Sequence, residues 1–119
     1  MTEEDRKLLL KDLSARLLYG IICDDGYGNV LELNGIDKPN TATFKCFDKT
    51  FWTTDLDKCK PYLFPLSSMT EEELKEYDIQ CCIYDDIICH IDWLNAHHFD
   101  YRGFIEKGLA IDATGQNVY

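Results

Sequence analysis

The spacing of hydrophobic residues changes along the chain from a helical period to an alternating one. In the first part, Leu9, Leu13 and Leu17 recur at helical spacing. Thr2, followed by three acidic residues, is a typical helix start, because acids in the first turn favour the helix dipole. Gly20 follows the last apolar residues, as glycine often does after a helix. The pattern therefore predicts an amphipathic helix that ends before Gly20.

Four short segments after this helix have the composition of β-strands. Turn-forming residues separate them, and Gly26-Tyr27-Gly28 is typical of a hairpin turn between the first two. Further turns are expected at 37–40 and 48–49. The four segments cover residues 19–23, 30–33, 41–47 and 50–53. They predict an antiparallel meander with a curled, barrel-like tendency.

The segment 60–66 contains Pro61 and Pro65, neither of which has a backbone N–H to donate. Such a segment fits neither a regular helix nor a central strand. We therefore expect an extended stretch that lays Tyr62, Leu63 and Phe64 over the sheet.

Helix signals dominate the chain after residue 69. Thr70 and Glu73 have the spacing of a capping box, which predicts a short acidic helix to about Tyr77. Residues 79–84 fit either a strand or a helix. Another helix is expected after Asp85 or Asp86. Its apolar face would comprise Ile87, Ile91, Leu94 and His98.

The last third is expected to end in a short helix and a strand. Asp100 is a candidate cap for the helix, and Gly108 is a candidate terminator. Residues 109–111 then resume a strand, and 113–119 are expected to form a tail. The whole pattern predicts one α+β domain over 1–119. Its core is expected to include Leu13, Leu17, Phe44, Leu63, Ile91 and Leu94.

Negative charge is concentrated in one segment. The net charge is −10, and residues 71–100 hold nine acids against Lys75 alone. Such a surface repels phosphate, which argues against direct nucleic-acid binding. It attracts a protein partner with a basic surface and speeds association with it. The alternative is that these acids only keep the chain soluble.

The six cysteines are not arranged as a metal or redox motif. No C-x-x-C pair occurs, and the chain starts with acidic residues where a signal peptide would be basic. No apolar run approaches the ~20 residues needed to cross a bilayer. The sequence therefore favours a cytoplasmic protein with reduced thiols and no membrane span. It leaves the oligomeric state open.

His97 and His98 are the candidate catalytic residues, together with Asp100 or Cys89. Neighbouring side chains point about 100° apart on a helix and to opposite faces of a strand, so both histidines cannot easily bind one ion. Zinc needs three or four ligands, and the sequence predicts no metal and no cofactor. A small enzyme or ligand-binding protein that uses these residues remains an alternative.

Three segments resemble a family of short uncharacterised proteins that is common in gut bacterial genomes, particularly in prophages and other mobile elements. The similarity lies in residues 1–18, in 60–73 (KPYLFPLSSMTEEE) and in 92–111, which includes DYRGFIEKGLAI. Together they cover about half of the chain. The resemblance implies a phage or mobile-element setting in the cytoplasm and supplies no catalytic residues.

These observations favour a small acidic, non-enzymatic binding protein. In the setting that the resemblance implies, it would be an accessory or anti-host-defence factor, and its carboxylates could mimic a nucleic-acid backbone. A structural phage component is a further alternative. Aromatic residues and arginine often anchor binding sites, although aromatic residues are more often buried in the core. The candidate partner-binding residues are Glu72, Glu76, Asp85, Asp86, Trp93, His98, Tyr101 and Arg102.

Overall fold

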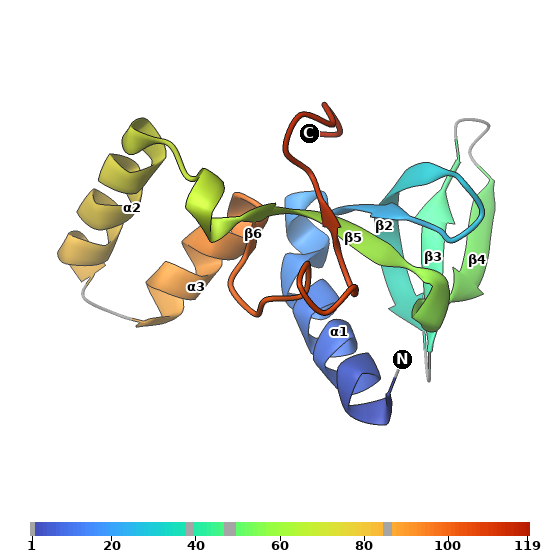
Figure 1. Cartoon of the computed structure of the whole chain (residues 1–119). Helices are drawn as coiled ribbons and strands as arrows, with labels where there is room; N and C mark the ends of the chain where they lie inside the picture. Colours follow the sequence, from blue (N-terminus) through green and yellow to red (C-terminus); the bar gives the residue numbers. More distant parts are fainter. Residues whose placement is uncertain (1, 38–39, 47–49, 85–86) are drawn as a thin grey trace.

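A computed structural model describes residues 2–37, 40–46, 50–84 and 87–119, with the side chains of 80–84 left out. It has the expected α+β architecture (Figure 1). The helices are α1 (Glu3–Arg16), α2 (Glu71–Tyr84) and α3 (Ile87–Ala96). The strands are β1 (Ile22–Asp24), β2 (Val30–Asp37), β3 (Thr41–Lys45), β4 (Phe51–Asp55), β5 (Lys60–Pro65), β6 (Phe99–Asp100) and β7 (Ile111–Asp112).

The predicted N-terminal helix is confirmed as α1. The backbone N–H of Asp5 donates to the Thr2 hydroxyl over 3.1 Å, and the Asp5 carboxylate accepts from the Thr2 N–H in return. A short 3-10 turn follows α1, and Gly20 then adopts a left-handed conformation with φ of 71°. Leu9 and Leu13 are fully buried against the sheet. The apolar stripe in the sequence is therefore the packed face of α1.

The predicted antiparallel meander is also confirmed, but it does not close into a barrel. Strands β1 to β4 pair in chain order, and the described residues form a seven-stranded sheet in the order β4-β3-β2-β1-β5-β6, with β7 also paired to β5. Closure would require β4 to pair with β1. The free side of β1 is occupied by β5 instead, so β4 remains an edge strand and the sheet stays open.

The prediction that residues 60–66 cannot form a central strand was wrong. Strand β5 pairs antiparallel with β1 through Lys60 and Pro61, parallel with β7 through Tyr62 and Leu63, and parallel with β6 through Phe64 and Pro65 (Figure 1). Its prolines stand near its two ends, at Pro61 and Pro65. Between them, the Phe64 N–H is free to donate to the His98 carbonyl over 2.8 Å. A proline excludes only its own donor, so this strand is possible at the centre of the sheet.

The second half of the chain differs from expectation in two helices. Residues 79–84 are helical, because α2 continues to Tyr84. The short helix expected after Asp100 does not form, and residues 101–110 make turns. The Asp100 carboxylate instead stabilises these turns, since it accepts the N–H groups of Phe104 and Ile105 at 2.9 and 3.0 Å. Within the described ranges, no helix has the length and apolar character to span a membrane.

Among the described residues, the buried apolar side chains form two clusters and not the single core that was predicted. The larger cluster holds Leu13, Phe44 and Leu63, with Leu17 partly buried at its border. Leu94 belongs to a smaller cluster with Trp93 and Phe99. Ile91 is 38% exposed, so its placement in the core was wrong.

The segment 113–119, which was expected to form a tail, contacts the sheet through its first and last residues, while residues 114–117 are exposed. Ala113 is buried, and its N–H donates to the Leu63 carbonyl over 2.8 Å. The Tyr119 hydroxyl donates to the Tyr62 carbonyl over 2.7 Å. The Tyr119 ring stacks on His98 with the two ring centres 3.7 Å apart. These contacts tie the segment to β5.

Candidate functional site

Helices α2 and α3 form a hairpin that projects from the sheet. Figure 1 shows α3 beside β6 and α2 farther out, with α3 between α2 and the rest of the molecule. The capping box that the sequence predicts opens α2, since the Glu73 N–H donates to the Thr70 hydroxyl (3.1 Å) and the Thr70 N–H donates to the Glu73 carboxylate (3.0 Å). The hairpin therefore offers much of its surface to solvent.

Trp93 attaches the hairpin to the domain. Its ring stacks on those of His97 and Phe99, with ring centres 3.9 and 5.8 Å away, and Tyr77 of α2 meets it edge-on at 5.3 Å. Only 7% of Trp93 is exposed. This candidate partner-binding residue is therefore buried in the core, which was the more usual of the two positions considered for it, and it does not form an exposed anchor.

Among the side chains of the hairpin that the structure describes, five large apolar ones are exposed. Such residues are normally scattered singly over a surface, and a group of them often marks an interaction site. They are Leu74 (49%), Ile79 (59%), Ile87 (74%), Ile88 (62%) and Ile91 (38%). Ile87, Ile88 and Ile91 lie within about one turn of one another on α3, and we call these three the hairpin apolar surface. Hydrophobic spacing cannot distinguish a covered stripe from an uncovered one, so the sequence did not reveal it.

Acidic side chains accompany this surface. Glu72 and Glu76 are exposed and stand one helical turn apart on α2. The Glu76 carboxylate lies 3.8 Å from Nε2 of His97 on α3. Asp85 and Asp86, the remaining acidic candidates, lie outside the described residues. The hairpin thus combines uncovered isoleucines with carboxylates.

Tyr101 and Arg102 take part in a polar network instead of forming an exposed patch. The Tyr101 hydroxyl donates to the Asn95 side chain over 2.8 Å. The guanidinium groups of Arg16 and Arg102 lie 5.0 and 5.2 Å from the centre of the Tyr101 ring. The Arg102 Nε donates to Asp12 over 3.1 Å. These residues link α1 to the chain that follows α3.

Asp12 and Arg16 at the centre of this network were missed in the sequence. Both are fully buried, and the Arg16 Nε donates to the Asp12 carboxylate over 2.8 Å. A signal was present, because positions 12 and 16 fall on the same face of α1 as Leu9 and Leu13. A charged pair at i,i+4 within an apolar stripe indicates a buried ion pair.

The residues of the enzymatic alternative do not converge on one centre. Nδ1 of His97 donates to the Trp93 carbonyl over 2.9 Å, while His98 stacks on Tyr119. Asp100 is occupied by backbone N–H groups. In the part of the chain that the structure describes, no group of three His, Cys, Asp or Glu residues could hold a metal ion.

Two of the buried cysteines are also poorly suited to act as nucleophiles. Burial raises the pKa of the Cys59 thiol to about 12, and burial together with the neighbouring Cys59 raises that of Cys23 well above its ordinary value. The thiolate is the reactive form of cysteine. Both thiols therefore remain protonated near neutral pH.

His98 makes the stability of the fold depend on pH. Burial, together with the nearby positive charge of Arg16, lowers the pKa of its imidazole from 6.5 to about 4. Its Nδ1 is buried, and it has no hydrogen-bond partner among the described residues. The unfolded chain therefore takes up this proton before the folded one, and stability should fall as the pH drops from 6.5 to 4.

The full shift would correspond to about 3.5 kcal/mol, since each pKa unit corresponds to about 1.4 kcal/mol. We expect a smaller loss of roughly 2–3 kcal/mol, because His98 is only partly buried and water screens part of the effect. Urea unfolding at several pH values would measure it. The matched control is His98→Asn, because His98 has φ of 62° and asparagine tolerates that conformation. The free energy of unfolding of this variant should depend less on pH between 6.5 and 4 than that of the wild-type protein. Equal pH dependence of the two proteins would contradict the prediction.

The comparisons with known proteins add no relative to this description. No protein-family model, no curated protein and no solved structure matches the chain.

Proposed function

We propose that this protein is a non-enzymatic binding domain that docks a basic amphipathic helix onto the α2–α3 hairpin. The observation that carries the proposal is the hairpin apolar surface, whose isoleucines Ile87 and Ile88 are 74% and 62% exposed. An amphipathic helix buries its apolar face in such recognition, with anchors at helical spacing. Burial of one isoleucine side chain stabilises a complex by about 1.5–3 kcal/mol.

Charge favours a basic partner over a second copy of the chain. Residues 71–100 carry nine acids and one lysine, so two hairpins would repel each other on approach. Lysine or arginine residues on a partner would instead be attracted to Glu72 and Glu76 and would speed association. Carboxylates alone would suit mimicry of a nucleic-acid backbone. The exposed isoleucines on the same hairpin favour an apolar anchor that is assisted by charge.

The proposal also covers the biological setting in which the protein acts. The resemblance of residues 60–73 and 92–111 to proteins of prophages and mobile elements supports an accessory or anti-host-defence role in the cytoplasm. A factor of this kind acts by occupying a host protein, and the hairpin supplies a surface for that contact. Neither the structural phage component nor the enzymatic alternative is favoured by a specific contact among the described residues.

A labelled model helix of leucine and lysine tests the apolar part of the proposal. The double variant Ile87→Ser and Ile91→Ser should weaken its binding at least ~30-fold, because two buried side chains are lost. Fluorescence anisotropy would give the dissociation constants. Leu18→Ser is the matched control, since Leu18 is 92% exposed but lies beside α1. Equal affinities for all three proteins would refute the proposal.

The acidic residues should act mainly on the association rate. The double variant Glu72→Lys and Glu76→Lys should slow binding of the same helix far more than it speeds dissociation. The effect should shrink with salt, because exposed charges are screened over ~8–10 Å at physiological ionic strength. Stopped-flow measurement at several salt concentrations checks this. The control carries Asp37→Lys and Glu106→Lys, which change the net charge by the same amount outside the hairpin. If the two double variants bound the helix at the same rate, the change in association rate would depend only on net charge and not on the position of the acids.

A further inference from the structure

Strand β4 forms one edge of the sheet, at the end of the molecule opposite the hairpin. It pairs with β3 on one side, and no described strand lies on its other side (Figure 1). In the same view α2 lies at the far end of the molecule. An edge strand presents a row of unpaired backbone groups that can pair with another strand. The free side of β4 is therefore a second surface that is open to a partner.

The hydrogen bonds at the two ends of the β3–β4 ladder show how β4 is oriented. The Cys46 N–H donates to the Thr50 carbonyl over 2.8 Å at one end. The Leu56 N–H donates to the Asn40 carbonyl over 2.7 Å at the other. Hydrogen-bonded and non-bonded pairs alternate along an antiparallel ladder, and the register between the two ends has no shift. Both ends therefore give the same result, which is that the even-numbered residues of β4 bond to β3.

The odd-numbered residues of β4 turn their backbone groups to the free edge. These residues are Phe51, Thr53 and Asp55. The Asp55 carbonyl already accepts from Sγ of Cys59 over 3.6 Å. Within the described part of the chain, the free row thus consists of the N–H and carbonyl groups of Phe51 and Thr53 and the N–H of Asp55. A strand that adds to this edge must bond to these groups.

The free side of β4 lacks the features by which proteins usually protect an edge strand. Such features are charged residues, prolines, bulges and very short strands. Residues 51–54 contain neither a charge nor a proline, and the pairing with β3 has no bulge. The strand has five residues, whereas β6 and β7 on the other side of the sheet have two each. In the described sheet, β4 is therefore the edge that is suited to pairing.

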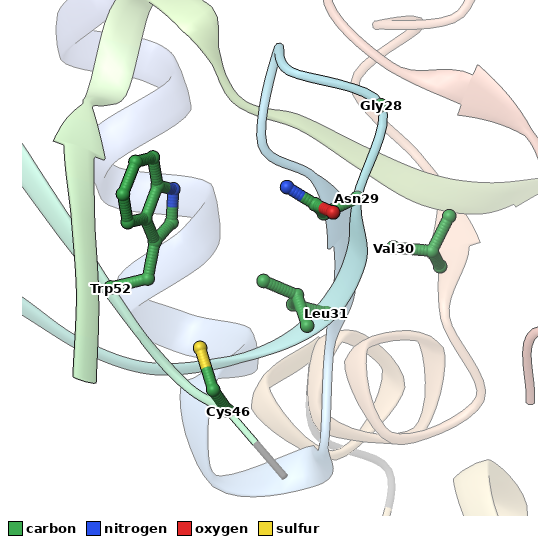
Figure 2. Close-up of a pocket in the computed structure, with 6 residues that line it drawn as sticks. All are labelled: Gly28, Asn29, Val30, Leu31, Cys46 and Trp52. Atoms are coloured by element: carbon green, nitrogen blue, oxygen red, sulfur yellow. The ribbon is translucent and has the colours of Figure 1, made fainter. Parts of the chain in front are cut away.

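Trp52 makes the core-facing side of this edge apolar. It lies opposite Phe44, which is fully buried, yet 42% of Trp52 is exposed. Figure 2 shows its ring beside a hollow of about 460 Å³ whose lining includes Leu31 and Cys46. The Tyr27 ring meets the Trp52 ring edge-on, with the ring centres 6.0 Å apart. The exposed part of Trp52 is available to a strand that pairs with β4.

We propose that β4 pairs antiparallel with β4 of a second copy of the chain, centred on Thr53, so that one continuous sheet runs through a dimer. The Thr53 N–H of each copy then donates to the Thr53 carbonyl of the other copy. The Asp55 N–H of each copy likewise donates to the Phe51 carbonyl of the other. The two Trp52 side chains become diagonal neighbours about 7–8 Å apart, a distance that aromatic rings can bridge.

The symmetry of this pairing favours a second copy over an unrelated strand. Both copies bring the same row of free groups and the same tryptophan, so one contact covers both edges. A two-fold contact of this kind also closes on itself. Addition of β4 to the opposite edge of another copy would instead build a filament, but the two-residue strands there offer few groups for pairing. Residues 51–54 carry no charge that would select a charged peptide.

The net charge of −10 does not oppose this dimer strongly. Residues 71–100 hold nine acids and one lysine, which accounts for 9 − 1 = 8 of these negative charges. The hairpin that carries most of these acids lies at the end of the molecule away from β4 (Figure 1), and the longest axis measures 41 Å. Exposed charges are screened over ~8–10 Å at physiological ionic strength. Nearer to β4, residues 51–70 hold two acids and two lysines.

Sedimentation equilibrium at several concentrations tests the pairing. The average mass of wild-type protein should rise reversibly from that of one chain toward that of two. Thr53→Lys and Thr53→Glu should each weaken dimerisation at least ~10-fold, because like charges then face each other across the axis. An equimolar mixture of the two variants should dimerise again, since lysine then faces glutamate. Thr53 is exposed, so circular dichroism of both variants should match that of the wild type.

Thr114 provides the matched controls, because it is an exposed threonine outside the strands. Thr114→Lys and Thr114→Glu make the same changes of charge and should dimerise as the wild type does. Cysteine variants test the register independently. Under mild oxidation Thr53→Cys should form a disulfide between copies, since directly paired Cα atoms lie ~5.5 Å apart. Thr114→Cys and wild-type protein should not form it.

Three results would overturn the inference. The first is a wild-type protein that keeps the mass of one chain up to ~1 mM. The second is unchanged dimerisation in both charged Thr53 variants, which would place the contact elsewhere. The third is a mixture of these variants that stays monomeric, which would exclude pairing centred on Thr53. The variant with Ile87→Ser and Ile91→Ser should dimerise normally, so the edge and the hairpin can fail independently; loss of the dimer in that variant would place the contact on the hairpin.

Discussion

Replacing Asp12 with alanine is expected to lower the free energy of unfolding by about 3–5 kcal/mol, because it leaves a buried guanidinium without its counter-charge. Asp12 accepts from the Nε atoms of both Arg16 and Arg102. The Phe99 carbonyl, which accepts from Nη2 of Arg16 over 2.6 Å, would be the hydrogen-bond acceptor that remains for Arg16 among the described residues. Its Nη1 already has no hydrogen-bond partner among the described residues. Chemical denaturation followed by circular dichroism would measure the loss.

The matched control is a second Arg–Asp pair at the surface. Arg6 makes two hydrogen bonds of 2.6 Å to Asp57, and the two side chains are 31% and 38% exposed. Asp57→Ala should therefore cost at most about 1 kcal/mol, since water replaces an exposed partner. Similar losses in the two variants would show that Asp12 and Arg16 are not buried as described.

Replacing Leu13 with alanine should destabilise the fold by about 2–5 kcal/mol, because it leaves a cavity between α1 and the sheet. Leu13 has no exposed surface and belongs to the larger cluster. Alanine favours helix at least as well as leucine does, so the loss reports packing and not helix propensity. The same change at Leu18, which is 92% exposed, should alter stability by no more than about 0.5 kcal/mol.

Leu94→Ala distinguishes the two clusters. Leu94 is 9% exposed and packs in the smaller cluster with Trp93 and Phe99. A loss of about 2–5 kcal/mol is expected there as well. Amide hydrogen exchange should show faster opening of α2 and α3 in this variant and of α1 in Leu13→Ala. Uniform acceleration throughout the chain in both variants would indicate that the two clusters unfold as one unit.

Local signals were sufficient to predict the elements whose stability is local. The capping residues Thr2 and Thr70 are followed by helices, and the glycines Gly26 and Gly28 lie between β1 and β2, as predicted. Pairings between distant residues carried no such signal. The position of β5 depends on β6 and β7, which lie tens of residues later, and the prolines of β5 suggested the opposite.

The candidate site was only partly predictable for the same reason. Exposure of Glu72 and Glu76 follows from their charge, and the sequence suggested it. The sequence could not show that Trp93 is buried while Ile91 is partly exposed, because both are apolar residues of one helix. Which side of a helix is covered depends on where the rest of the chain packs. The aromatic pair of Tyr27 and Trp52 likewise joins two segments that only the folded sheet brings together.

The strands that pair with β5 are synthesised at different times, and this affects folding on the ribosome. Its partner β1 is made before it, but β6 and β7 begin at Phe99 and Ile111, after the whole α2–α3 hairpin. At about 5–20 residues per second, the interval between the end of β5 and the start of β7 is roughly 2–9 s. Throughout that time one side of a central strand presents unpaired backbone groups, which readily pair with other chains. The nascent chain therefore passes through a stage at which aggregation competes with folding, and a ribosome that stalls within the hairpin would prolong it.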